Sequence, residues 1–107
     1  MRIILTGSGI AIYFLARRFI SKGDQISIIT DNEADADYYS RNLKALVLLG
    51  NVSDIGLLVE AQGKTADIFI GMTPRDQDNF VLCLMAREYF QIPHILSVVN
   101  DPDNEEI

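Results

Sequence analysis

The sequence is poor in the residues from which disulfides and metal sites are built, with one cysteine and one histidine in 107 residues. The lone cysteine, Cys83, excludes an internal disulfide and a zinc site made of cysteines, and we expect it to be a buried thiol on a helix. The lone histidine, His94, excludes a metal site built on a pair of histidines.

Long apolar runs and clusters of basic residues are also missing. No apolar stretch reaches the roughly eighteen residues of a membrane-spanning helix, and the first residues do not follow the basic, apolar and small-residue order of a signal peptide. A net charge of −6 without a Lys/Arg run argues against nucleic acid, whose phosphates need clustered positive charge. We therefore expect a cytoplasmic protein with no nucleic-acid partner and no direct insertion into a membrane.

What the sequence does contain suffices for one globular domain over residues 1–107, because 49% of the residues are hydrophobic and 22% are charged. Apolar, β-branched runs alternate with segments of helical periodicity, and apolar strands of this kind are typical of a sheet covered by helices on both faces. The predicted fold class is α/β, a Rossmann-like doubly wound parallel sheet of about five strands. After the first strand and helix we expect strands at 25–30, 45–49, 66–71 and 94–99, helices at 34–43, 55–62 and 75–90, and a polar tail at 100–107 that starts no new element.

The opening stretch, residues 1–19, combines an apolar run, two glycines two positions apart and apolar residues at helical spacing. This order predicts a strand, a glycine turn and a helix. The first N–H groups of such a helix lack partners within it, and its dipole favours negative charge there, so the turn suits a phosphate. A purely structural Gly-x-Gly turn is the alternative. The candidate phosphate-binding residues are Gly7, Ser8, Gly9, Ile10 and Ala11.

In a doubly wound sheet, ligands bind at the carboxyl ends of the strands, where the connection order reverses. The second strand ends with Thr30, which could donate to a ribose hydroxyl, and Asp31 could reach the ribose after a shift of one residue. Asp31 could equally begin a turn and cap the next helix. After the third strand, residues 50–54 either hold the edge of an adenine ring or form only a turn and a helix cap; the candidates there are Asn51, Val52 and Ser53.

The segment after the fourth strand, residues 73–79, is the most polar part of this predicted edge. Arg75 is the cation best placed to meet a phosphate, and Thr73 is a cap candidate beside a proline suited to a first helical turn. The structural alternative is a capped helix start with solvated charges. The candidates here are Thr73, Arg75, Asp76 and Asn79.

No nucleophile, general base and orienting residue occur together in a recognisable pattern. The chain is also too short for a substrate domain opposite a nicotinamide ring. A nucleotide site without a reacting partner suggests a sensor that is not an enzyme. Two other classes stay open, the cofactor-binding half of an NAD(P)-dependent oxidoreductase and an interaction module that kept the fold without the ligand.

Five motifs follow one another along the chain: Gly7-x-Gly9, Gly50-Asn51-x-Ser53-Asp54, Ala66-Asp67-Ile68-Phe69-Ile70, Thr73-x-x-Asp76-x-x-Asn79 and Val98-x-Asn100-Asp101-Pro102. In this order they resemble the N-terminal RCK/KTN (TrkA-N) domain of Trk/Ktr-type potassium uptake regulators, over the whole chain. The resemblance implies a cytosolic regulatory subunit or domain, peripheral to the inner face of the membrane, that binds an adenine nucleotide (AMP, ADP, ATP or NAD(H)) and gates transport. It also implies a homodimer or higher ring assembly on a membrane potassium transporter subunit.

Carried over by position, the resemblance places residues 7–9 at the phosphates, Asn51 and Ser53 near adenine, and Thr73, Asp76 and Asn79 at the start of the helix beside the ligand. Family members often carry arginine, glycine and an acid where this chain has Ile10, Ile12 and Thr30. These departures argue against a triphosphate and lower the expected affinity for NAD, so a monophosphate or diphosphate nucleotide assisted by Arg75 is at least as good a candidate. The C-terminal subdomain of the family is absent, which implies a fragment or a reduced member.

Overall fold

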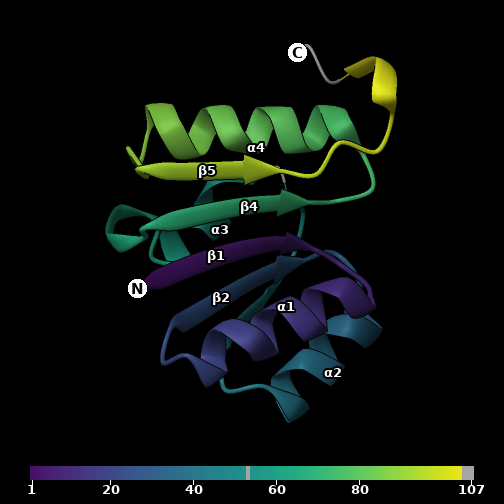
Figure 1. Cartoon of the computed structure of the whole chain (residues 1–107), viewed down its shortest axis with the longest axis vertical. Coiled ribbons are helices and arrows are strands. Elements are labelled where there is room, and N and C mark those ends of the chain that lie inside the picture. The colour runs from purple at the N-terminus through teal and green to yellow at the C-terminus, as the bar shows by residue number, and fades with distance from the viewer. Residues whose placement is uncertain (53, 105–107) are drawn as a thin grey trace.

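The computed structural model describes residues 1–52 and 54–104 and confirms the predicted Rossmann-like fold. Five parallel strands form one sheet in the order β3-β2-β1-β4-β5 (Figure 1). The chain runs outward from β1 through β2 to β3, and then crosses back to the other side of β1 for β4 and β5. The strands are β1 (Arg2–Gly7), β2 (Gln25–Thr30), β3 (Leu46–Leu49), β4 (Ile68–Met72) and β5 (His94–Ser97); the helices are α1 (Ile10–Ser21), α2 (Glu33–Asn42), α3 (Ile55–Glu60) and α4 (Asp76–Glu88), with short 3-10 helices η1 (Gly63–Thr65) and η2 (Pro102–Asn104).

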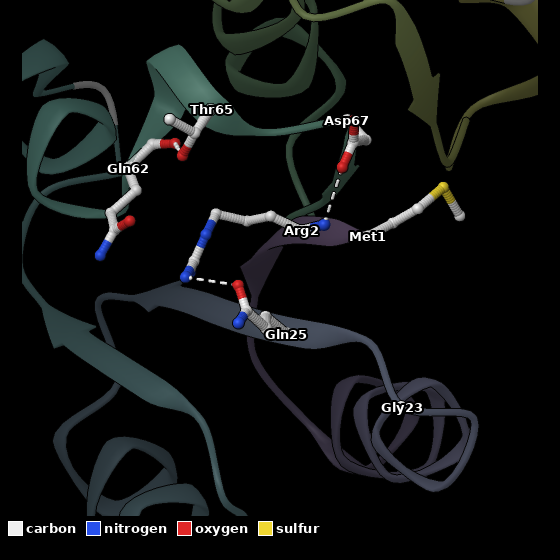
Figure 2. Close-up of a pocket in the computed structure, with 7 residues that line it drawn as sticks. All are labelled: Met1, Arg2, Gly23, Gln25, Gln62, Thr65 and Asp67. Carbon is white, nitrogen blue, oxygen red and sulfur yellow. Dashed lines mark hydrogen bonds between the residues drawn. The ribbon is translucent and has the colours of Figure 1, made fainter.

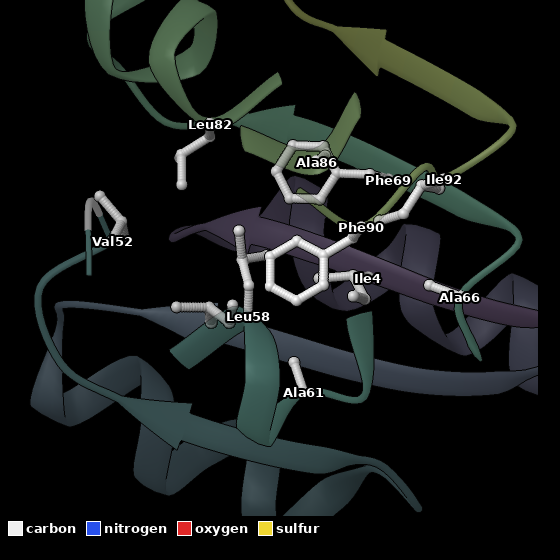
Figure 3. Packing of buried hydrophobic residues seen from close by; sticks show 11 residues of the cluster. Ile4, Val52, Leu58, Ala61, Ala66, Phe69, Leu82, Ala86, Phe90 and Ile92 are labelled. Atoms are coloured by element: carbon white, nitrogen blue, oxygen red, sulfur yellow. The ribbon is translucent and has the colours of Figure 1, made fainter. Parts of the chain in front are cut away.

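Alternate side chains of the central strands enter two separate cores, one on each face of the sheet. Ile3 and Leu5 of β1 face the layer of α1 and α2, and their cluster also contains Ile12, Ala16, Ile26, Ile28, Tyr39 and Ile70. Ile4 faces α3 and α4, in a cluster drawn in Figure 3 with Ile29, Val52, Leu58, Ala61, Ala66, Phe69, Leu82, Ala86, Phe90 and Ile92. This explains why the strands are apolar at successive positions. Within the described residues, no helix is long and apolar enough to cross a membrane.

The helix expected to run to Gln62 is shorter, because α3 ends at Glu60. Gln62 itself adopts a left-handed conformation with φ of 67°, and the chain continues into η1. Gly63 is therefore needed for packing: a Cβ there would lie 2.8 Å from the Phe90 ring and 2.9 Å from the Leu58 carbonyl oxygen.

Three predictions about the C-terminal half are also wrong in detail. The long helix begins at Asp76, so Thr73 and Pro74 lie in the preceding loop, and the tail contains η2. Cys83 is half-buried, with its Sγ 3.9 Å from the Leu96 carbonyl oxygen, and is not fully buried. Other element ends differ from prediction by one or two residues, as helix and strand ends generally do.

The pairing register brings the carboxyl ends of the strands to one edge of the sheet (Figure 1). Thr6 pairs with Ile29 of β2 on one side and with Gly71 of β4 on the other. The connection order reverses at β1, so the loops after β1, β2 and β4 surround the position where this fold class binds ligands.

Candidate functional site

The turn between β1 and α1 contains two glycines with different roles. Gly7 has φ of 140°, and a Cβ on it would lie 2.5 Å from the Met72 carbonyl oxygen and 3.2 Å from the Thr73 nitrogen. Gly7 therefore allows the ends of β1 and β4 to approach each other. Gly9 has φ of 94°, and no atom lies within 4 Å of the position of a Cβ. This open space lets a ligand approach the backbone closely.

The N-terminus of α1 follows directly from this turn. Gly9 is the N-cap residue, no side chain caps the helix, and its first turn contains no acidic residue. Ile10 is 64% exposed, Ala11 is exposed and Ser8 is half-buried. Ile12, at the third glycine position of the dinucleotide fingerprint, is fully buried in the core and so does not fill the turn. The start of α1 therefore presents backbone N–H groups and the positive end of the helix dipole, which is the chemistry that binds an anion.

The two peptides that flank Gly9 are each bound by a side chain of α2, and no motif in the sequence indicates these contacts. Its N–H donates to Asp35 Oδ2 at 2.8 Å, and its carbonyl oxygen accepts from the Tyr39 hydroxyl at 2.6 Å. Burial raises the pKa of Tyr39 to about 12, the Asp35 charge adds to the rise, and the bond to Gly9 opposes it. The hydroxyl therefore stays protonated and donates to Gly9 at neutral pH.

The end of β2 places the two predicted ribose candidates differently. Thr30 is fully buried, and its Oγ1 accepts from Asn32 N–H at 3.2 Å. Asp31 is exposed at the edge of the sheet. The cap of α2 is Asn32, whose side chain accepts from the Asp35 N–H, so Asp31 does not serve as the cap. A role for either residue at a ribose stays a prediction.

The loop after β3 contributes one exposed and one buried candidate. Asn51 is exposed, and its carbonyl oxygen accepts from Asp54 N–H at 2.9 Å. Val52 is 7% exposed and packs into the core, so its side chain belongs to the interior. Asp54 caps α3 through the Gly56 N–H. Ser53 lies outside the described residues.

The polar residues after β4 form a hydrogen-bonded network that fixes two loops. Asn79 is 1% exposed; its Oδ1 accepts from the N–H and the hydroxyl of Thr73 at 2.9 and 2.8 Å, and its Nδ2 donates to the Thr73 and Val98 carbonyl oxygens. The Asp76 carboxylate accepts from Asn100 N–H, Asn100 Nδ2 and Asp101 N–H at 2.7, 2.9 and 2.9 Å. The motif residues of this segment therefore join the loop before α4 to the chain after β5.

Arg75, the predicted phosphate cation, occupies the N-cap position of α4 without a capping side chain. Its side chain is 66% exposed and its Nε lies 3.5 Å from Asp78 Oδ2. The guanidinium is thus at the carboxyl edge of the sheet but is already paired with an acid of its own helix.

The opposite edge of the sheet carries a separate hollow. It measures about 410 Å³ and lies at the amino ends of the strands (Figure 2). The Arg2 guanidinium donates to Gln25 Oε1 at 2.9 Å there, and Arg2 N–H donates to Asp67 Oδ2 at 2.9 Å. No candidate named from the sequence lines this hollow, whose residues are Met1, Arg2, Gly23, Gln25, Gln62, Thr65 and Asp67.

Comparison with known proteins identifies the family of the chain. Residues 3–107 match the TrkA-N domain. The chain belongs to the TrkA-N family. This confirms the resemblance to RCK/KTN domains that the ordered motifs indicate.

Curated relatives of this TrkA-N chain are potassium uptake proteins. It is 37% identical over 106 residues to the Trk system potassium uptake protein TrkA homolog of Methanothermobacter thermautotrophicus, covering 99% of this chain and 49% of the relative. It is 32% identical over 109 residues to the TrkA homolog of Pyrococcus abyssi, covering 100% of this chain and 47% of the relative. The TrkA-N chain spans about half the length of the curated relatives it matches.

Solved structures give the same picture of the TrkA-N fold. The GsuK channel bound to NAD matches with a TM-score of 0.84 and 28% identity, over 98% of this chain and 19% of that one. The structure of GsuK bound to ADP matches with a TM-score of 0.83 and 28% identity, over 98% and 27%. The TrkA-N domain of Escherichia coli ybaL, at 17% identity and a TM-score of 0.81 over 90% and 70%, shares the fold.

Proposed function

We propose that this TrkA-N domain binds an adenine nucleotide at the turn between β1 and α1, without turning it over. The observation that carries the proposal is the α1 N-terminus, which has no capping side chain, no acid in its first turn and open space at Gly9. Backbone amides of residues 9–11 would meet phosphate, and the ends of β2 and β3 would lie toward the ribose and adenine. The matching structures of the GsuK channel bound to NAD and of GsuK bound to ADP support this ligand class.

The biological role we propose is that of a cytosolic regulatory part of a potassium uptake system. The Trk system relatives support it. In this role the nucleotide favours one arrangement of the loops at the carboxyl edge, and a dimer or ring of these domains transmits the difference to a membrane potassium transporter subunit. A ligand shifts such an equilibrium only by its difference in affinity for the two arrangements.

The binding proposal is tested with a substitution that separates binding from folding. Ile10→Glu places a carboxylate at the first position of α1, where the helix dipole favours it, so the fold should be kept. The same charge repels phosphate, and we expect titration calorimetry with AMP, ADP, ATP, NAD and NADH to show affinity reduced about tenfold for whichever of them bind.

The matched control is Phe14→Glu, one helical turn further along α1 and 57% exposed. It adds the same charge to the same helix away from the turn and should leave affinity within about twofold. Equal losses in both variants, or no binding of any nucleotide to the unmodified protein, would contradict the proposed site. Hydride transfer from NADH to a substrate by this chain would contradict the regulatory role.

A further inference from the structure

Asp35 makes a contact that its position in α2 does not require. It is the third residue of the helix, from which a Glu or Gln side chain in a capping box accepts from the N–H of the N-cap residue. Here the Asn32 N–H donates to Thr30 Oγ1 instead, at 3.2 Å. The Asp35 carboxylate reaches across to the Gly9 N–H, 26 residues earlier in the chain, at 2.8 Å.

The backbone on the other side of Gly9 is also bound by α2. The Gly9 carbonyl oxygen, which belongs to the next peptide, accepts from Tyr39, a residue that is 1% exposed and packs in the core. The two bonds from α2 thus hold the two peptides that flank Gly9, and Asp35 is the partner of its N–H. An acid one helical turn away from Tyr39 therefore holds a donor at the mouth of the turn where a phosphate would bind.

The residues around this contact are mainly acidic, so the charge of an incoming anion decides how easily it displaces the Asp35 carboxylate. Among the described residues no cation pairs with Asp35, and Arg75 is paired with Asp78. Two further acids, Asp31 and Glu33, are exposed on the same loop and helix start. An incoming phosphate monoester dianion therefore meets more repulsion than a singly charged phosphodiester.

We propose that Asp35 is a specificity-determining residue of the nucleotide site: its carboxylate occupies the anion position on the Gly9 amide and must leave before phosphate binds. This inference rests on the proposed function. It selects against ligands with a terminal phosphate dianion, such as ADP, and favours dinucleotides, whose linked phosphates carry one charge each.

The test compares Asp35→Ala with Asp37→Ala by titration calorimetry with ADP and with NAD. Both variants remove one acid from α2, but Asp37 is exposed and pairs with Arg41. We expect Asp35→Ala to raise affinity for ADP about tenfold and for NAD by about threefold, and Asp37→Ala to change either by less than twofold. Asp35→Asn, which keeps an acceptor for Gly9 without the charge, should give a smaller gain of the same sign and serves if the alanine variant does not fold.

A second readout follows the Gly9 amide by NMR. In the proposed exchange, its resonance shifts when ADP replaces Asp35, and the same resonance is already shifted in free Asp35→Ala. Unchanged affinities in Asp35→Ala, with nucleotide still bound by the unmodified protein, would overturn this inference and leave the proposed function standing. A lower affinity would also overturn it, because Asp35 would then be a ligand contact. Absence of binding in every variant would refute the proposed function itself.

Discussion

Replacing Gly7 by alanine should destabilise the domain more than any other single-methyl addition in the glycine turn. The added Cβ would lie 2.5 Å from the Met72 carbonyl oxygen and 2.8 Å from its carbon. These are backbone atoms of the paired strand β4, and Gly7 pairs with Met72 in the sheet. They can move only if β1 and β4 separate locally.

The magnitude follows from two contributions. A non-glycine residue held at positive φ outside the left-handed helical region costs about 1–3 kcal/mol. Gly7 has such a conformation, with φ of 140°. Overpacking adds about 1–3 kcal/mol. A total near 4 kcal/mol is a large share of the roughly 5–15 kcal/mol that a domain of this size has.

The assay is equilibrium unfolding in urea followed by circular dichroism. With a slope of about 2 kcal/mol per molar, Gly7→Ala should lower the midpoint by about 2 M. Gly9→Ala is the control because φ is 94° there but no atom lies within 4 Å of the added Cβ. It should show only the backbone cost, about 1–3 kcal/mol. If Gly7→Ala loses no more stability than Gly9→Ala, the approach of the two strands is not what requires glycine.

Three further predictions concern groups of known environment. The pKa of Tyr39 is raised from 10.0 to about 12, so the free energy of unfolding should fall as pH rises from 10 to 12. In urea titrations over this pH range, Tyr39→Phe should not show the part of the fall that Tyr39 causes. Asn79→Ala leaves buried groups of Thr73 without their partner and should cost about 3 kcal/mol in urea unfolding, against well under 1 kcal/mol for the exposed Asn42→Ala. Burial raises the pKa of the Cys83 thiol, so alkylation by iodoacetamide at pH 8 should be slower than for a cysteine peptide and should approach the peptide rate after unfolding.

The fold was predictable because its signals are local. Runs such as 25–30 are rich in β-branched residues, and strand and helix alternate without interruption, which leaves few arrangements open. The errors lie at element ends. The helix predicted over 55–62 ends at Glu60, Gln62 takes the left-handed conformation, and Gly63 makes room for Phe90.

The candidate site was predictable only in part. The turn at residues 7–11 follows from spacing, but the bonds from Asp35 and Tyr39 to Gly9 join residues 26 and 30 positions apart and leave no periodic signal. The sequence offers one hint, an acid three residues after Asn32, which is a residue type that often caps helices.

The sequence also does not show whether polar residues beside a predicted crevice face a ligand or one another. Thr73 and Asn79 bond to each other, and Val52 packs inward. Their contact with a nucleotide stays a prediction.

The hydrogen bonds of Asp76 have a mechanical consequence. Because its carboxylate accepts three N–H groups from Asn100 and Asp101, we expect the first turn of α4 and the chain that follows β5 to move together. Asn100 Nδ2 also donates to the Thr73 carbonyl oxygen, so a displacement of the Thr73 loop should reach the neighbouring Val99, which is 44% exposed. A fluorophore attached at position 99 should therefore report conformational changes at the crevice without contacting a bound ligand.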